Sequence, residues 1–166
     1  MNRRHFLAVA GAASLSGPFL AGPAAALHWT DIPARLSVSP GLSTLAAALQ
    51  AAGLMESLKA RGPFTLFAPS NEAFERLPAG ALARLLRPEN RAKLEGILLY
   101  HLAAARVTSD QFTGRRVRIR MMSGDTVAVD GTRQPITFNR NARMLAADSE
   151  GRNGVIHVID GVLMPG

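Results

Sequence analysis

The arginines of the segment Arg115–Met121 have a spacing that could do chemistry. Successive side chains of a strand point to opposite faces, so Arg116, Arg118 and Arg120 would share one face and apolar residues the other. Residues two apart on a strand lie roughly 6.6 Å apart, and guanidinium groups bind sulfate, phosphate and carboxylate. We therefore predict a candidate polyanion site, for an acidic glycan or a small anion, at these three arginines. The commoner alternative is a solvated strand face whose charges discourage edge pairing.

The sequence gives weaker evidence for a catalytic site than for an anion site. A glycosidase needs two facing carboxylates, and Asp148 and Glu150 could share one strand face by spacing, but such a pair is usually just solvated. The sequence contains no nucleophile elbow, no metal-binding histidine pair on one helix and no phosphate loop. The absence of cysteine excludes disulfides, thiolate metal centres and a cysteine nucleophile. We expect no catalytic residues, no cofactor and no enzymatic activity.

A metal site would depend on how the N-terminus is processed. Cleavage after Ala25 would leave Ala26, Leu27 and His28 first, and their amine, amides and imidazole could form a square-planar Cu(II) or Ni(II) site. Cleavage after Ala26 removes that site and fits the small-x-small rule better. The expectation is therefore that no metal is bound.

The N-terminus itself is typical of an export signal. Arg3 and Arg4 directly precede the apolar segment 6–20, in the order used by twin-arginine signals. That segment is shorter than the roughly 20 residues of a membrane-spanning helix. We predict a signal peptide over 1–26, a lead-in over 27–37 and one domain over 38–166. This division implies a periplasmic or secreted protein with no transmembrane segment after cleavage.

Composition limits the partners. The chain has 166 residues, of which 48% are hydrophobic, enough for one domain with a core. Basic residues outnumber acidic ones by 19 to 12, which gives a net charge of +7. Nucleic acid is still not expected as a partner, because only 5% of residues are aromatic and no helix-turn-helix, zinc or ribonucleoprotein motif occurs.

Hydrophobic periodicity divides the chain into a helical half and a strand half, which indicates an α+β fold. Helical spacing covers the following segments: 42–52 with a stop at Gly53, 55–60, a short helix capped by Ser70, 81–86 and 88–100. Short strand patterns cover 64–68, 115–121, 126–129, 136–138, 143–147 and 155–159.

Three segments resemble a known family. Thr65–Phe74 and Asn153–Asp160 are similar to the two signature boxes of the fasciclin-like domain, and Ile97–Leu102 is similar to its tyrosine-histidine segment. The resemblance covers 38–166 and implies a wedge of about seven short strands with helices packed around it. The box residues expected to determine the fold are Phe67, Pro69, Asn71, Phe74, Gly154, His157 and Asp160.

The resemblance also implies a function: noncovalent adhesive contacts with cell-surface or matrix proteins or polysaccharides. It implies partner-binding roles for Tyr100, His101 and Asp148, although Ser149 stands where the family has isoleucine and Ala103–Ala105 replaces its proline-glycine turn. Tyr100 and His101 also fit the commoner role of hydrogen-bonded packing at a helix end. The oligomeric state is left open.

Two box residues have structural roles by position. His157 lies between two apolar residues of a strand, so its ring should point to the opposite face and bridge backbone groups. Asn71 follows the capping Ser70 and should satisfy free backbone groups at the strand-to-helix turn.

Overall fold

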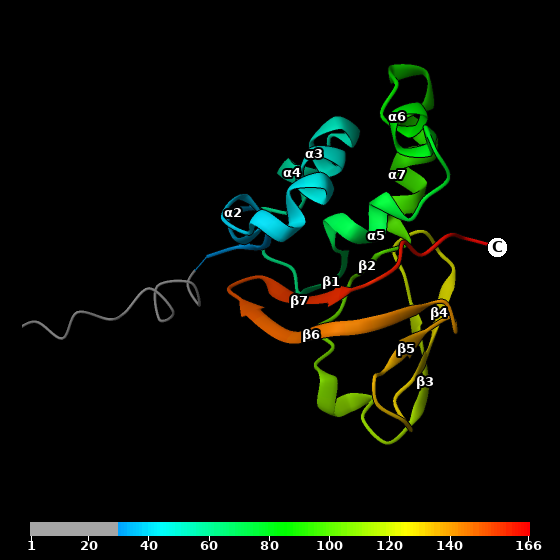
Figure 1. The fold of residues 1–166 in the computed structure, drawn as a ribbon. Helices are drawn as coiled ribbons and strands as arrows, with labels where there is room; N and C mark the ends of the chain where they lie inside the picture. The colour runs from blue at the N-terminus through cyan, green and yellow to red at the C-terminus, as the bar shows by residue number, and fades with distance from the viewer. Residues whose placement is uncertain (1–29) are drawn as a thin grey trace, which may run out of the picture.

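The computed structural model describes residues 30–166. The predicted signal peptide and the Ala26–His28 metal site lie outside these residues. In the described part, the longer helices gather above the strands β1 and β7, and β3, β4 and β5 lie below, away from them (Figure 1). Every helix in residues 30–166 is too short or too polar to cross a membrane.

One sheet of seven strands organises the described residues, in the order β2-β1-β7-β6-β5-β4-β3. The strands are β1 Phe64–Pro69, β2 Leu102–Ala103, β3 Arg116–Arg120, β4 Thr126–Asp130, β5 Thr137–Phe138, β6 Ala142–Gly151 and β7 Gly154–Ile159. β1 and β7 are parallel, and the other pairs are antiparallel. The sheet curls until its two edge strands, β2 and β3, meet. Their contact is a hydrogen bond in which the Met122 N–H, just after β3, donates to the Leu102 carbonyl of β2 at 2.7 Å. The α+β prediction is confirmed.

The helices follow local capping signals. They are α2 Ile32–Ser37, η1 Pro40–Leu42, α3 Ser43–Ala52, α4 Leu54–Ser57, α5 Asn71–Glu75, α6 Ala81–Leu85, η2 Pro88–Asn90, α7 Arg91–Leu99 and η3 Ser109–Gln111. Gly53, with φ 78°, ends α3 in the left-handed conformation as predicted. The Ser70 hydroxyl accepts from the Ala73 N–H at 3.2 Å and caps α5, also as predicted.

The segment 27–37, expected to be a lead-in, contains a helix that packs against the core. α2 lies within it, capped by the Asp31 carboxylate, which accepts from the Ala34 N–H at 2.9 Å. Ile32 and Leu36 are buried against the other helices. The segment was not predicted as a helix because its six residues are too few for a clear helical period.

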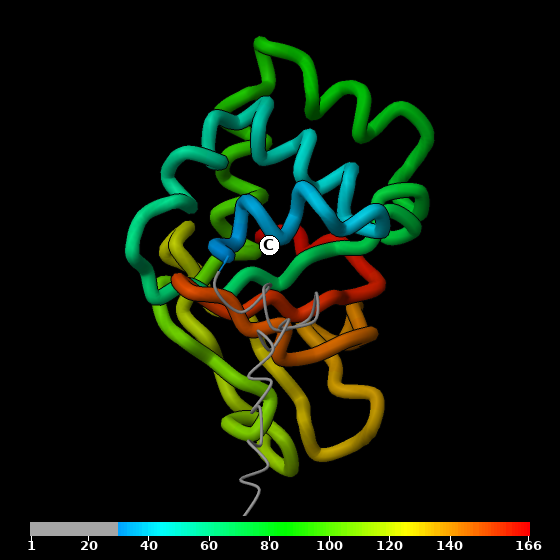
Figure 2. Tube along the Cα trace, turned by 90° about the vertical axis from the view of Figure 1, so that its left-hand side faces the viewer, coloured from blue at the N-terminus to red at the C-terminus, as the bar shows by residue number. Residues whose placement is uncertain are grey.

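Two apolar clusters lie on opposite faces of β1 and β7. In Figure 2 these two strands lie between the helical layer and the rest of the sheet. In β1, Leu66 and Ala68 pack against the helices, and Phe67 points into the curl of the sheet. β7 alternates in the same way, with Ile156 facing the helices and Ile159 facing the curl. Both strands are buried on both faces, which explains their continuous apolar character.

Gly154 allows the closest approach between these strands. A Cβ at this position would lie 2.3 Å from the Phe64 carbonyl oxygen and 2.7 Å from Ile32 Cδ1. Only glycine leaves room for α2 and β1 to pack here. Phe74 is buried among the helices, and the Asp160 carboxylate accepts from the Arg143 N–H at 2.6 Å.

Asn71 stabilises a different corner from the one predicted. Its Oδ1 accepts from the Thr44 N–H at 3.0 Å and its Nδ2 donates to the Pro40 carbonyl at 2.9 Å, so it caps α3 and not its own turn. Asn153, whose role was not predicted, does the same for α2: it accepts from the Ile32 N–H at 3.0 Å and donates to the Leu58 carbonyl at 2.6 Å. Both amides join segments far apart in the sequence.

Candidate binding surface

Tyr100 and His101 lie in the interior, at the C-terminal end of α7. Tyr100 is 4% exposed and His101 is 1% exposed. The Tyr100 hydroxyl accepts from Asn139 Nδ2 at 2.9 Å, and its ring packs inside the curl of the sheet. Direct contact between either ring and a partner is therefore excluded in this conformation, and both serve as packing elements, the commoner role expected from their position.

The ring of His101 connects two backbone segments. Its Nε2 accepts from the Leu163 N–H at 2.9 Å, and its Nδ1 lies 2.8 Å from the Ile97 carbonyl oxygen. Because Nε2 accepts, the proton is on Nδ1 and donates to Ile97. Burial lowers the pKa of His101 to about 4, with the hydrogen bond to Ile97 opposing part of that shift. The imidazole is therefore neutral at pH 7.

Asp148 acts mainly on the loop that precedes β3. Its carboxylate accepts from the Ser109 N–H at 2.7 Å and from the Ser109 hydroxyl, and so caps η3. Asp148 has φ 54°, a left-handed conformation that aspartate tolerates better than most residues, and this irregularity in β6 explains why the predicted strand 143–147 stopped short. Its carboxylate is thus engaged by Ser109 and stabilises the loop, although it is partly exposed.

His157 faces the side of β7 opposite Ile156 and Val158, as predicted. Its ring stacks on Phe67 at a centroid distance of 5.5 Å. Nδ1 accepts from the Asp148 N–H at 3.2 Å, and Nε2 donates to the Val107 carbonyl at 2.7 Å. Burial lowers its pKa, so it too is a neutral bridge between backbone groups, as expected.

Ser109, Asp148 and His157 do not form a catalytic triad, although they lie together. The serine hydroxyl contacts the aspartate, and both ring nitrogens of His157 are occupied by backbone groups, so the hydroxyl has no base. Asp148 and Glu150 are also separately engaged, since Glu150 pairs with Arg106 at 3.0 Å. Within residues 30–166, no group of three or more histidine or carboxylate side chains could hold a metal ion.

The outer face of β3 carries the predicted arginine row. Arg116, Arg118 and Arg120 are exposed, and Ile119 between them is buried. β4 pairs with β3 so that these arginines lie opposite Asp130, Ala128 and Thr126 respectively. The alternation is as predicted, and the register adds small or acidic neighbours on the same face.

Arg116 differs from the other two because it has an internal partner. Its Nε lies 2.8 Å from Asp130 Oδ2. The Thr132 hydroxyl and N–H, both donating to Asp130, together with Arg116 hold the pKa of Asp130 at about 2. The Arg116 charge is thus matched locally, so the three arginines of the row are not equivalent.

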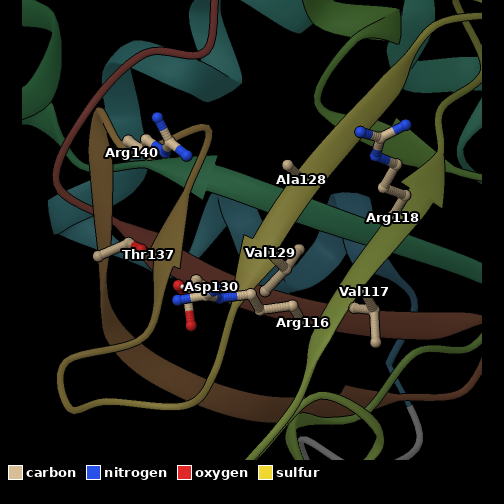
Figure 3. Close-up of a pocket in the computed structure, with 8 residues that line it drawn as sticks. All are labelled: Arg116, Val117, Arg118, Ala128, Val129, Asp130, Thr137 and Arg140. Carbon is tan, nitrogen blue, oxygen red and sulfur yellow. Dashed lines mark hydrogen bonds and ion pairs between the residues drawn. The ribbon is translucent and has the colours of Figure 1, made fainter.

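A groove on this face brings in an arginine that the sequence did not point to. It has a volume of about 350 Å³ and is lined by Arg116, Val117, Arg118, Ala128, Val129, Asp130, Thr137 and Arg140. Figure 3 shows Arg118 and Arg140 on opposite sides of Ala128. We call Arg118, Arg140 and the Ala128 between them the arginine cradle.

Arg140 reaches the groove from the turn between β5 and β6, where it has φ 59°. The turn is fixed by Asn139, whose N–H donates to the Ala128 carbonyl at 2.7 Å and whose Oδ1 accepts from the Ala128 N–H at 2.9 Å. Asparagines, which are typical of turns, lie between the predicted strands 136–138 and 143–147, but the sequence does not predict that this turn docks beside Ala128.

Comparison with known proteins gives a consistent result. A model of the fasciclin domain matches residues 40–165. The chain is 44% identical over 123 residues to protein sll1483 of Synechocystis, covering 74% of this chain and 67% of that protein. It is 32% identical over 151 residues to immunogenic protein MPB70 of Mycobacterium bovis, covering 87% and 75%.

Larger proteins contain similar segments. The chain is 40% identical over 123 residues to transforming growth factor-beta-induced protein ig-h3 of Sus scrofa, but spans only 17% of that protein. The fold is similar to a domain pair from the insect cell adhesion molecule fasciclin I, with a TM-score of 0.72 and 21% identity, over 82% of this chain and 51% of that one.

Proposed function

The chain belongs to the fasciclin domain family, and from this premise we propose that it is an exported module for noncovalent adhesion. Its partners are cell-surface or matrix proteins or polysaccharides of the envelope. The solved relative with a similar fold is described as part of a cell adhesion molecule. The twin-arginine sequence supports export to the periplasm or beyond.

The observation that carries the proposal is the outer face of β3, β4 and β5. The helices lie on the other side of β1 and β7, so this part of the sheet is not covered by them (Figure 1). Arg118, Arg120 and Arg140 are exposed there, and in residues 30–166 their side chains have no hydrogen-bonding or ionic partner. Unmatched guanidinium groups on an open sheet face suit binding better than they suit fold stability.

The proposal includes no enzymatic activity. Three side chains that could take part in hydrolysis are occupied: His101 and His157 by backbone groups, and Asp148 by Ser109. This supports a binding module over a hydrolase.

Attachment by a deletion strain tests the function. We expect cells lacking the protein to attach less well to surfaces or matrix, and the purified exported protein to sediment with isolated envelope. The charge-reduced variant Arg118→Ser/Arg140→Ser tests whether the sheet face is responsible. Arg61→Ser/Arg84→Ser is the matched control, because both residues are exposed and lie outside β3–β5. Unchanged attachment together with no sedimentation would refute the proposed function.

A further inference from the structure

We infer that the arginine cradle binds the carboxylate groups of an acidic polysaccharide, with Arg118 and Arg140 as the recognition pair. This inference rests on the proposed function and names its ligand and its site. This pair differs from the arginine row predicted from the sequence, because it includes Arg140 and does not include Arg116.

The register of the sheet builds the cradle. Arg118 on β3 lies directly opposite Ala128 on β4, and the backbone of Ala128 is bonded in turn to Asn139, next to Arg140. A methyl group at position 128 leaves space between the two arginines, where a larger side chain would fill it. In Figure 3 both guanidinium groups lie in the upper part of the view, one on each side of Ala128.

Charge favours an anion in this space. Asp130 is the carboxylate among the lining residues, and Arg116 already pairs with it at 2.8 Å. Arg118 and Arg140 therefore contribute positive charge without an internal counter-charge. A carboxylate accepts two parallel hydrogen bonds from one guanidinium, which makes arginine suited to bind it in a fixed orientation.

The residues around the groove favour a polysaccharide over two other anionic partners, nucleic acid and a lipid surface. No aromatic ring lines the groove, so nucleic acid bases have no stacking platform there. The large exposed apolar residues of the described chain are Val38, Leu86, Met122, Leu145 and Met164, and none lines the groove, so a lipid surface has no apolar anchor at this site.

Arg120 extends the site in one direction. It lies two residues along β3 from Arg118, roughly 6.6 Å away along the strand, on the same exposed face. A second acidic sugar of the same chain can contact it while the first occupies the cradle. A polymer with repeated carboxylates therefore binds more tightly than a single sugar acid.

Titration of the exported protein with a soluble polyuronate tests the inference, with neutral dextran as the uncharged control. Arg118→Ser and Arg140→Ser should each weaken binding about tenfold. The double variant Arg61→Ser/Arg84→Ser, which removes at least as much charge elsewhere, should change affinity by less than about twofold. Raising salt from about 50 to about 200 mM should weaken wild-type binding roughly 20- to 40-fold if three arginines contact the polymer.

A gain-of-binding variant makes the test sharper. Asp130→Asn keeps an oxygen that can accept from the Thr132 N–H but removes the charge that engages Arg116. Freeing Arg116 should strengthen polyuronate binding about threefold or more. Thermal unfolding of each variant checks that the fold is retained. We expect little change in the midpoint, because the substituted side chains lie on the surface.

Several outcomes would overturn the inference. Equal loss in the Arg61/Arg84 control would mean that net charge alone drives binding. Unchanged binding by both cradle variants, or tighter binding to single-stranded DNA or to anionic lipid vesicles, would refute the assignment. If wild type and cradle variants sediment equally with envelope, the proposed function stands. The assignment of the cradle as the binding site is then refuted. Polyuronate binding that depends on the cradle, together with unchanged attachment and no envelope sedimentation, would instead refute the proposed function and keep the cradle.

Discussion

His101 should make the stability of this domain depend on pH mostly above the range in which its shifted carboxylates act. The ring is buried, and its pKa is about 4 in the folded protein, compared with the ordinary histidine value of 6.5. As pH falls, the unfolded chain therefore takes up a proton before the folded one does. The stability contributed by the neutral ring is complete above the unfolded pKa and is lost progressively as pH falls from 6.5 towards 4.

The size of the effect follows from the two pKa values. A difference of one unit corresponds to about 1.4 kcal/mol, so His101 accounts for about 3 kcal/mol of unfolding free energy between pH 7 and pH 4. His157, whose pKa burial also lowers, adds a contribution of the same sign. Asp130, with a pKa of about 2, and Glu72, whose pKa hydrogen bonds also lower, lose their contributions mainly below the ordinary carboxyl values of 3.8 and 4.5, at the lower end of this window.

The variant His101→Phe isolates the contribution. It keeps a ring in the core but leaves the Leu163 N–H without its acceptor, which costs about 1–3 kcal/mol at pH 7. Since phenylalanine does not titrate, the gap between wild type and variant should shrink by about 3 kcal/mol at pH 4 and close or reverse. Urea unfolding followed by far-UV circular dichroism measures both proteins. A gap that stays constant from pH 7 to pH 4 would refute the reasoning.

Three further predictions concern packing, the β6 irregularity and processing. Gly154→Ala should destabilise by about 1–3 kcal/mol because its Cβ meets the Phe64 carbonyl, whereas Gly96→Ala, with open space around it in α7, should stabilise by about 0.5–1 kcal/mol; equal midpoints in urea would contradict this. Asp148→Ala should cost about 1–2 kcal/mol and speed hydrogen exchange in 106–111, while Asp148→Asn keeps an acceptor and the left-handed φ and should cost less; similar exchange in both would argue against the cap. N-terminal sequencing of the exported protein should find Leu27 first, and Ala26 first would restore the metal site.

Features that depend on a local pattern could be predicted from the sequence. The two-residue period placed Arg116, Arg118 and Arg120 on one face of β3, and turn residues located the strands of the second half. Ser70 and Gly53 were recognisable because capping involves neighbours within a few residues.

Features that depend on which segments meet could not be predicted in this way. Asn71 caps a helix that begins 28 residues earlier in the chain, at Ser43. Arg140 enters the groove only because β5 pairs with β4, and Arg116 leaves the row only because Asp130 lies opposite it. The burial of Tyr100 and His101 likewise results from how the edges of the sheet meet beside the C-terminal end of α7. Period and composition carry no information about such pairings.

The central place of β7 constrains when the chain can fold. β7 lies between β1 and β6 and pairs with β1 along Phe64–Pro69, although about ninety residues separate them in sequence. A ribosome therefore releases the helices and the other six strands of the described sheet before the strand that joins them exists. The core closes only after β7 has been made, so a chain truncated before Gly154 would present an open sheet. An export route that accepts only folded cargo would thereby discard incomplete copies before they reach the envelope.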